Sequence, residues 1–204
     1  MDRSDSGIRI VSICGSVRAG NFTAKALRLV EDELRTGFGA KVISFDLAEI
    51  SLPMPGTGDS ADAEAMRQAV TSATGVVLAT PEYHGSFSSV LKLAIENLGF
   101  PSVLAGKPVA LLGVAAGQIG AIKSLEHLRS VCSHVGAIVL PGPVSVAGVN
   151  RVFDVDGNCL DPGVEKRVRG TAVGLFNYIR ENVCPKFALE EMVRAGETTG
   201  LPGP

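Results

Sequence analysis

The chain has 204 residues, a length that fits one domain. Its hydrophobic content of 46% is high for a soluble chain, yet no apolar run reaches the roughly 18 residues that a membrane-spanning helix needs. The formal net charge of −2 leaves no broad basic field, which argues against a nucleic-acid backbone or an anionic membrane as the main partner.

The first predicted strand, residues 8–14, is apolar and rich in β-branched side chains. Asp2 and Asp5 precede this short apolar strand, which lacks the basic start and the cleavage site of a secretory signal, so we expect a cytoplasmic protein. The strand breaks at Gly15 into a loop, and a helix is predicted over residues 21–38. A loop in this position directs its backbone N–H groups at one spot, beside the positive end of the helix dipole. A phosphate binds well at such a spot.

The rest of the chain repeats this alternation of strand and helix. Apolar or β-branched runs predict strands over residues 41–47, 76–80, 108–114 and 137–140, with a continuation of the last to residue 146 left open. Helical spacing of apolar side chains predicts helices over residues 60–74, 88–98, 121–135 and 162–182. Residues 185–204 are short on core residues and are expected to fray.

Five rounds of alternation, with strands too apolar to face water, predict an α/β fold. We expect a doubly wound, five-stranded parallel sheet with helices on both faces, a three-layer α/β/α domain over residues 1–184. Ligands of such sheets bind at the carboxyl ends of the strands, where the strand order reverses. The loops after the first, third and fourth strands are rich in small and polar residues, so we expect them to converge on one pocket.

The first of these loops, residues 15–23, has the side chains that a phosphate monoester needs. Ser16 and Thr23 offer hydroxyls, Arg18 a charged fork, and Asn21 an amide at the expected helix N-cap. The loop lacks the lysine of a P-loop and the full dinucleotide fingerprint. A glycine-containing turn with an ordinary cap is therefore the alternative.

The second loop, residues 81–86, offers contacts for a planar ring. Tyr83 can lay its flat face on such a ring, His84 can hydrogen-bond at its edge, and Gly85 lets the backbone approach closely. Glu82 is interpreted as a structural hydrogen-bond acceptor and not as a general base. The alternative is a turn that only caps the next helix through a serine.

The third loop, residues 115–120, has few side chains in the way. Gly117 and Gly120 can present amide N–H groups that stabilise negative charge on a ring carbonyl during reduction, and a flexible turn is the alternative. Asp46, at the end of the second strand, is interpreted as a surface carboxylate, with the ribose-binding acid of dinucleotide folds as the alternative. The cysteines are widely spaced without a metal-ligand pattern, so we expect buried thiols at Cys14, Cys132, Cys159 and Cys184. His127 and His134 fall within a predicted helix, where solvated or core roles are expected.

Two motifs resemble the signatures of the NADPH-dependent FMN reductase family. They are Gly15-Ser16-Val17-Arg18 with residues 21–23, and Thr80-Pro81-Glu82-Tyr83-His84-Gly85-Ser86 followed by Val90-Leu91-Lys92. This family has a flavodoxin-like fold and includes quinone, azo-dye and chromate reductases. The resemblance covers residues 8 to about 146, and residues 153–161 are similar to the region before the last helix of the family. The chain departs from many members at His84, where they have Asn, and in the third loop, which in them is usually a serine-rich turn with two glycines.

The resemblance implies non-covalent FMN, with NADPH or NADH as electron donor. Around the phosphate it places Ser16, Arg18, Asn21, Phe22 and Thr23. Along the isoalloxazine it places Pro81, Glu82, Tyr83, His84, Gly85 and Ser86. At the pyrimidine end it places Ala116, Gly117, Gln118 and Gly120. It also implies the strand order 2-1-3-4-5 and a homodimer or homotetramer with the helix after Ser86 near the interface.

The sequence therefore predicts an FMN-dependent NAD(P)H oxidoreductase that passes electrons through bound FMN to a small-molecule acceptor. Quinones, flavin, azo compounds and metal oxyanions all remain open as acceptors. Because the flavin carries the chemistry, no catalytic side chain and no metal is expected. The alternative is an FMN-binding electron carrier or redox regulator with little nicotinamide turnover, although the near-neutral charge favours the enzyme. A nucleotide-binding protein without flavin is a third option.

Overall fold

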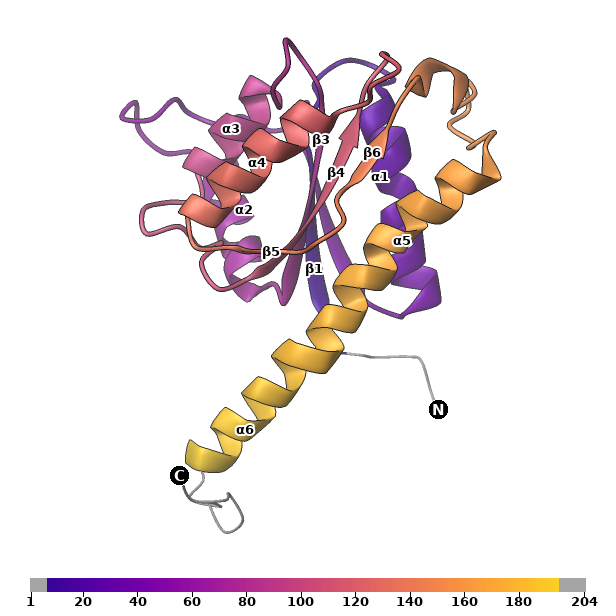
Figure 1. The fold of residues 1–204 in the computed structure, drawn as a ribbon. Helices are drawn as coiled ribbons and strands as arrows, with labels where there is room; N and C mark the ends of the chain where they lie inside the picture. Colours follow the sequence, from indigo (N-terminus) through magenta and orange to yellow (C-terminus); the bar gives the residue numbers. More distant parts are fainter. Residues whose placement is uncertain (1–6, 195–204) are drawn as a thin grey trace.

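The computed structural model describes residues 7–194, and the strands of this region form one parallel sheet (Figure 1). Neighbouring strands follow the order β2-β1-β3-β4-β5, and β6 also pairs with β4. The strands are β1 (Arg9–Cys14), β2 (Lys41–Asp46), β3 (Gly75–Pro81), β4 (Pro108–Val114), β5 (Ile138–Val139) and β6 (Val144–Val146). This order confirms the doubly wound, flavodoxin-like arrangement that the sequence predicts.

The fifth predicted strand is divided into two short pieces. β5 pairs with Pro108 and Val109 at the start of β4, whereas β6 pairs with the end of β4 from Leu112 to Val114. Residues 141–143 separate the pieces and include two prolines, which have no N–H to give to a strand ladder. The continuation to Val146 that the sequence left open is therefore present, after a break.

Helices cover both faces of the sheet. They are α1 (Phe22–Asp32), α2 (Ala61–Ser72), α3 (Ser89–Glu96), α4 (Ile122–His134), α5 (Pro162–Tyr178) and α6 (Cys184–Arg194). Figure 1 shows α1 and α5 on one side of the sheet and α2, α3 and α4 on the other. Each side has its own hydrophobic cluster, so the three-layer α/β/α prediction is confirmed.

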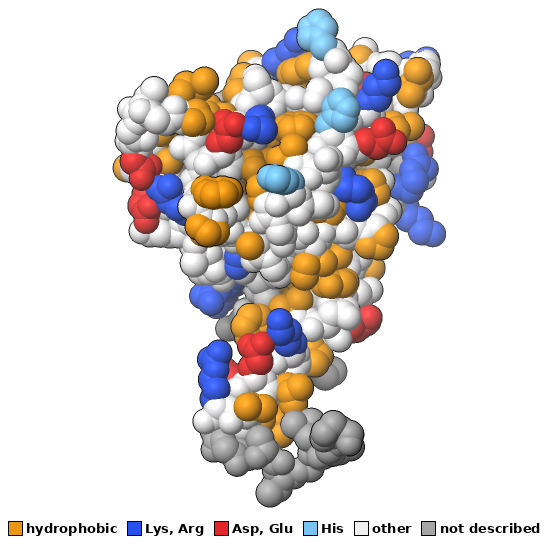
Figure 2. Space-filling view, turned by 60° about the vertical axis from the view of Figure 1, so that its left-hand side comes forward, with side chains coloured by type: hydrophobic (Ala, Val, Ile, Leu, Met, Phe, Trp, Pro, Cys, Tyr) orange, Lys and Arg blue, Asp and Glu red, His pale blue; other side chains and the backbone are white. Residues whose placement is uncertain are grey.

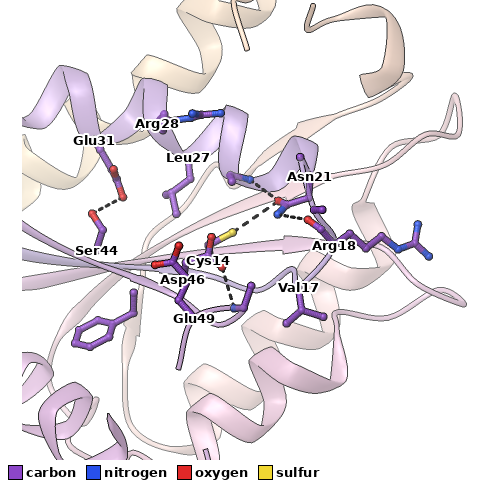
Figure 3. A pocket seen from close by; sticks show the side chains of 15 residues that line it. Cys14, Val17, Arg18, Asn21, Leu27, Arg28, Glu31, Ser44, Asp46 and Glu49 are labelled. Atoms are coloured by element: carbon purple, nitrogen blue, oxygen red, sulfur yellow. Dashed lines mark hydrogen bonds between the residues drawn. The ribbon is translucent and has the colours of Figure 1, made fainter. Parts of the chain in front are cut away.

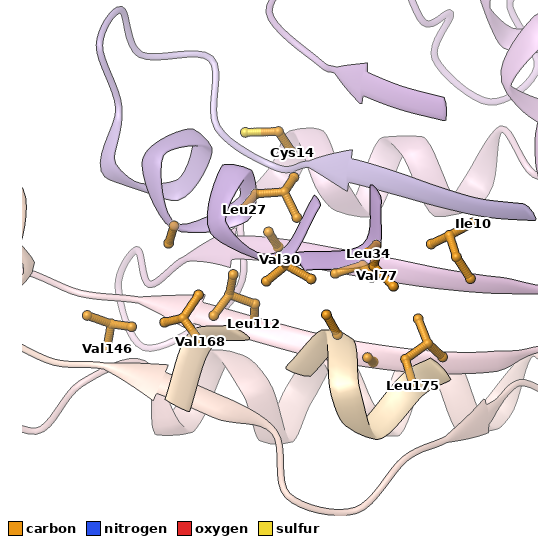
Figure 4. Packing of buried hydrophobic residues seen from close by; sticks show 14 of the residues in the cluster. Ile10, Cys14, Leu27, Val30, Leu34, Val77, Leu112, Val146, Val168 and Leu175 are labelled. Carbon is orange, nitrogen blue, oxygen red and sulfur yellow. The ribbon is translucent and has the colours of Figure 1, made fainter. Parts of the chain in front are cut away.

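The central strands are buried along their whole length because both of their faces are covered. Every residue of β3 and β4 is buried, as is typical of parallel strands between two helical layers. In β1, Ile10 and Val11 point to opposite clusters, which follows from the two-residue period of a strand. Figure 4 shows the first cluster, in which Val30 of α1 and Leu175 of α5 pack with Leu112 of β4.

Side-chain caps fix where the helices begin. The Asn21 side chain accepts a hydrogen bond of 2.7 Å from the backbone of Ala24, which confirms it as the N-cap of α1. Ser60, Ser88 and Asp161 cap α2, α3 and α5 in the same way. The positive end of α1 therefore lies directly behind the first loop.

The C-terminal end of the chain differs from the prediction. After α5 the helix continues through a π-helical turn, Ile179–Val183, into α6, so residues 185–194 are helical where a fraying tail was expected. None of the residues of α6 is buried, and this helix projects from the body of the molecule (Figures 1 and 2). Its apolar side chains, which include Phe187 and Leu189, are exposed. Residues 195–204 lie outside the described residues.

The cysteines differ in their burial, and all four are free. Cys14 and Cys132 are buried as predicted, whereas Cys159 is half-buried and Cys184 is exposed, so the prediction of four buried thiols is wrong for these two. Across residues 7–194, no helix is long and apolar enough to cross a membrane. Within the same residues, no three His, Cys, Asp or Glu side chains come together as metal ligands would.

Candidate functional site

The loops that leave β1, β3 and β4 line one cavity of about 470 Å³. These three strands are neighbours in the sheet and parallel, so their carboxyl ends meet at one edge. The predicted site residues on the cavity wall are Ser16, Arg18, Asn21, Phe22, Thr23, Pro81, Glu82, Tyr83 and Ala116. The structure thus brings residues of all three predicted loops to one place.

The first loop contributes two hydroxyls that have no partner in the part of the chain that the structure describes. The side chains of Ser16 and Thr23 belong to residues only 1% exposed, and neither hydroxyl hydrogen-bonds another described residue. Within residues 7–194, the hydroxyl of Thr171 is the one fully enclosed side-chain polar atom without a partner. The hydroxyls of Ser16 and Thr23 are therefore not fully enclosed, and they are reached from the cavity whose wall they form. Both hydroxyls can therefore donate to a ligand in the cavity.

The N-terminus of α1 adds backbone donors beside these hydroxyls. The first N–H groups of a helix have no partner within the helix. The Asn21 side chain accepts from one of them, that of Ala24, and its own amide N–H donates to the Arg18 carbonyl at 2.9 Å. The first loop is therefore held in shape by Asn21, while the start of α1 stays available to an anion.

Arg18 joins the first loop to the second. Its guanidinium carbon lies 4.8 Å from the centroid of the Tyr83 ring, a cation–π contact. Arg18 is exposed and makes no ion pair with any residue in the described part of the chain. Its charge is thus free to meet an anionic ligand at the mouth of the cavity.

The second loop is a tight turn whose tip lies beyond the cavity wall. Tyr83 and Ser86 exchange backbone hydrogen bonds of 2.9 and 3.0 Å, and the two residues between them have positive φ, 49° for His84 and 73° for Gly85. His84, Gly85 and Ser86 are not on the cavity wall, although sequence reasoning placed them with the pocket. His84 itself is exposed.

Helix α4 supports the second loop from outside. Glu82 Oε2 accepts a hydrogen bond of 3.1 Å from the backbone of Ser124, which confirms its prediction as a structural acceptor. His127 Nδ1 lies 3.1 Å from the Ser86 hydroxyl. Sequence reasoning missed this second contact, because a histidine inside a predicted helix carries no signal of which loop it will meet.

The first residues of the third loop line the cavity, whereas its glycines lie outside the cavity wall. Ala115 and Ala116 line the wall, whereas Gly117, Gln118 and Gly120 do not. The Gly117 carbonyl accepts from Gly120 at 3.3 Å and from Gly148 at 3.0 Å, so it closes a turn. A Cβ atom at Gly120 would lie 2.4 Å from the hydroxyl of Ser145, so glycine is needed there for packing.

Two cavity residues were missed entirely by sequence reasoning. Val149 and Asn150 lie in a short 3-10 helix after β6, and both line the cavity. The backbone of Val149 donates to the carbonyl of Ala115 at 3.1 Å, which brings this segment against the third loop. Neither residue belongs to a motif, so no sequence signal marked them.

A nucleophilic thiol is absent from the described part of the cavity wall, and the nearby Cys14 is unreactive for a physical reason. Burial raises the pKa of the Cys14 thiol to about 11. At neutral pH this thiol stays protonated, so the first loop has no cysteine nucleophile.

Comparisons with known proteins agree with this geometry. The model of the NADPH-dependent FMN reductase family matches residues 8–150. The chain is 29% identical to an NAD(P)H-dependent FMN reductase of Pseudomonas aeruginosa, over 85% of this chain and 96% of that protein. It is 31% identical to a quinone reductase of Escherichia coli, over 83% of this chain and 95% of that protein.

Among solved structures, the chain is similar to a flavoenzyme NAD(P)H:(acceptor) oxidoreductase from Paracoccus denitrificans. The TM-score is 0.71 at 21% identity, with 85% of this chain and 98% of that chain covered. At this level of identity the similarity concerns the fold, which agrees with the strand order and the layers described above.

Proposed function

Because the chain belongs to the NADPH-dependent FMN reductase family, we propose that its three-loop cavity holds FMN and that the protein is an FMN-dependent NAD(P)H oxidoreductase. The observation that carries this proposal is the pair of nearly buried hydroxyls of Ser16 and Thr23, which open into the cavity beside the start of α1 and have no partner among the described residues. A phosphate supplies the acceptor oxygens that these donors lack.

The phosphate of FMN is assigned to the first loop. Ser16 and Thr23 donate their hydroxyls to it, and Arg18 at the cavity mouth adds a charge-assisted hydrogen bond. The side chain of Asn21 holds the loop in the conformation that exposes these donors. Phe22 contributes an apolar part of the wall.

The ring end of the cofactor is assigned to the second and third loops. Pro81 and Tyr83 form an apolar wall for a planar ring, and Ala116 leaves space beside it because its side chain is small. Glu82 is held by the backbone of Ser124 and so keeps the wall in place. His84, Gly85 and Ser86 at the tip, and Gly117, Gln118 and Gly120 in the third loop, lie beyond the wall and are proposed to contact the ring or its substrates.

FMN, when bound, supplies the hydride chemistry of the reaction. The residues of this chain bind the phosphate, orient the ring and leave one side of the cavity mouth open to a nicotinamide and then to the acceptor. No side chain of the wall has to act as an acid or a base for this role. We favour a quinone as acceptor, in line with the quinone reductase of Escherichia coli among the relatives.

The proposal includes a homodimer or homotetramer that works in the cytoplasm on small molecules. Phe100, shortly after α3, is 98% exposed, and Val90 and Leu93 of α3 are only partly buried. These apolar side chains are ones that a second copy would cover. Sedimentation analysis of the purified protein tests this part, and a monomer at micromolar concentration contradicts it.

An electron carrier with little nicotinamide turnover is the competing function, and the curated reductases among the relatives favour the enzyme. The deciding experiment records the visible spectrum of the protein after it is mixed with FMN and desalted. It then follows NADPH oxidation with a quinone present. We expect a retained flavin spectrum that NADPH bleaches without oxygen, and turnover faster than that of free FMN. A protein that retains no flavin, or that turns over no faster than free FMN, contradicts the proposal.

A further inference from the structure

A second cavity lies on the other side of the first loop from the one assigned to FMN. It has a volume of about 550 Å³ and is bounded by α1 and by the carboxyl ends of β1 and β2 (Figure 3). The two cavities share wall residues, namely Arg18, Ala19, Gly20 and Asn21. An extended ligand can therefore lie over the first loop with one end in each cavity.

Charged residues of both signs line this groove. Asp46 and Glu49 come from the end of β2 and the turn after it, whereas Arg28 comes from α1 (Figure 3). One carboxylate oxygen of Asp46 accepts the backbone N–H of Ala48 at 2.9 Å, and the other has no partner within the described residues. The side chains of Glu49 and Arg28 likewise make no hydrogen bond or ion pair with a described residue.

Two other charged residues of the groove are already committed, Arg18 to the proposed FMN phosphate and Glu31 to the fold. Glu31 accepts hydrogen bonds from Ser12 and Ser44 and forms an ion pair of 3.1 Å with Arg35. It is buried, so it serves the packing of α1 on the sheet. Asp46, Glu49 and Arg28 are therefore the charges that remain for a ligand.

The rest of the groove wall suits a flat apolar group. Val17 is 50% exposed and Leu27 and Phe45 also contribute to the wall. A ligand for this groove thus combines a planar base, hydroxyls that donate hydrogen bonds to carboxylates, and a group that can interact with an arginine. A nucleoside with a ribose has this combination, and the groove is large enough for one.

We propose that this groove binds the adenosine half of the nicotinamide coenzyme, with its ribose at Asp46. The opposed charges of Asp46 and Arg28 then set the choice between a 2′-hydroxyl and a 2′-phosphate on that ribose. A carboxylate accepts a hydroxyl and repels a phosphate, while a guanidinium attracts the phosphate. This inference rests on the proposed function, because the reductase needs the coenzyme beside the FMN cavity.

Two variants and one control test the assignment. Asp46→Asn removes the charge but keeps an oxygen that can accept the Ala48 N–H. Arg28→Ala removes the guanidinium of a residue on the groove wall. Arg194→Ala removes an exposed arginine from α6, which contributes no residue to the groove.

The measurement is calorimetric titration of the FMN-saturated protein with 5′-AMP and with 2′,5′-ADP, which differ by the 2′-phosphate. We expect Asp46→Asn to raise the affinity for 2′,5′-ADP relative to 5′-AMP about tenfold, and Arg28→Ala to lower it about tenfold. In Arg194→Ala, the ratio of the affinities for 2′,5′-ADP and 5′-AMP stays at the wild-type value. If neither groove variant moves the ratio, or if neither nucleotide binds at millimolar concentration, the inference is overturned.

Separate readouts keep this inference distinct from the proposed function. The FMN dissociation constant of each variant is measured by fluorescence quenching. Wild-type FMN binding together with an unmoved nucleotide ratio overturns the groove assignment and leaves the proposed function in place. Opposite shifts of the nucleotide affinity ratio in the two variants support the groove assignment. If the protein retains no flavin, the titrations are repeated without FMN, and the same opposite shifts give the same support.

Discussion

The guanidinium group of Arg18 stacks 4.8 Å from the centre of the Tyr83 ring, so the first and second loops touch above the proposed FMN site. Arg18→Ala removes the one arginine among residues 7–194 that lines the three-loop cavity. A charge-assisted hydrogen bond contributes about 1.5–3 kcal/mol, so we expect the FMN dissociation constant to rise by a factor of about 10 to 150. The measurement is quenching of FMN fluorescence on titration.

The fold of this variant should be unaffected, because Arg18 is exposed and its removal leaves no buried group unpaired. Thermal unfolding within about 0.5 kcal/mol of wild type is the expected control result. Tyr83→Leu, which removes the aromatic partner but keeps an apolar wall, serves as the matched variant. An unchanged FMN dissociation constant in Arg18→Ala contradicts the phosphate assignment.

Gly15 is the point at which β1 turns into the first loop, and a side chain does not fit there. A Cβ atom at this position would lie 2.7 Å from the carbonyl oxygen of Ala79 and 3.0 Å from the Cβ atom of Leu91. We expect Gly15→Ala to destabilise the protein by about 1–3 kcal/mol, the usual cost of overpacking. Urea denaturation measures this change.

Gly117→Ala is the control for this prediction, because a Cβ atom there meets nothing within 4 Å. Its free energy of unfolding should stay within about 0.5 kcal/mol of wild type. Equal effects of the two substitutions are the outcome that counts against tight packing at Gly15.

The fold was predictable from the sequence because buried parallel strands have continuous apolar runs. The fourth strand was predicted at the bounds that β4 has, and the third lies within one residue of β3 at each end. The start of α1 was predictable because a cap such as Asn21 is a local signal. The π-helical turns, Glu33–Gly37 and Ile179–Val183, were missed because one extra residue in a helical turn leaves the apolar spacing almost unchanged.

Residues of the candidate site were predictable where a motif marks a loop and not where tertiary packing supplies them. Ser16 and Tyr83 belong to loops that directly follow strands, so the edge of the sheet positions them. Val149 reaches the cavity through a backbone hydrogen bond to Ala115, which is 34 positions earlier in the chain. The contact of His127 with Ser86 likewise depends on how α4 packs. Neither relation has a local signature.

The buried carboxylate of Glu31 ties α1 to the first two strands. It accepts the hydroxyl of Ser12, which is fully buried, and that of Ser44. Glu31→Ala leaves the Ser12 hydroxyl without an acceptor, at a cost of about 1–3 kcal/mol. Chemical denaturation of the variant measures the loss, and FMN binding should persist because Glu31 is not on the wall of the FMN cavity.

Arg35→Ala is the companion variant for this network. The Arg35 side chain is 44% exposed, and an exposed ion pair contributes less than about 1 kcal/mol. The destabilisation should therefore be clearly smaller than that of Glu31→Ala. The reverse order indicates that the ion pair, and not the buried hydrogen bonds, holds α1 in place.

Thiol labelling should follow burial. Burial raises the pKa of Cys14 to about 11 and that of Cys132 to about 12, whereas Cys184 is exposed. At pH 8 a thiol with a pKa of about 11 is a thiolate in about one molecule in a thousand, so we expect iodoacetamide to modify Cys184 and to spare Cys14 and Cys132. Labelling of Cys14 should rise as the pH approaches its pKa. Mass spectrometry of the labelled peptides gives the order, and labelling of Cys14 as fast as Cys184 at pH 8 refutes it.

Helices α5 and α6 offer a matched pair of leucines that separates the core from the projecting helix. Leu175 of α5 is 0% exposed and packs in the first hydrophobic cluster, whereas Leu189 of α6 is 45% exposed. Leu175→Ala should cost about 2–5 kcal/mol, as buried leucines do. Leu189→Ala should change the free energy of unfolding by no more than about 0.5 kcal/mol, since alanine also suits a helix and no buried contact is lost. Denaturation at two protein concentrations measures both. A large effect at Leu189 that grows with concentration shows that α6 is covered by another copy of the chain in solution.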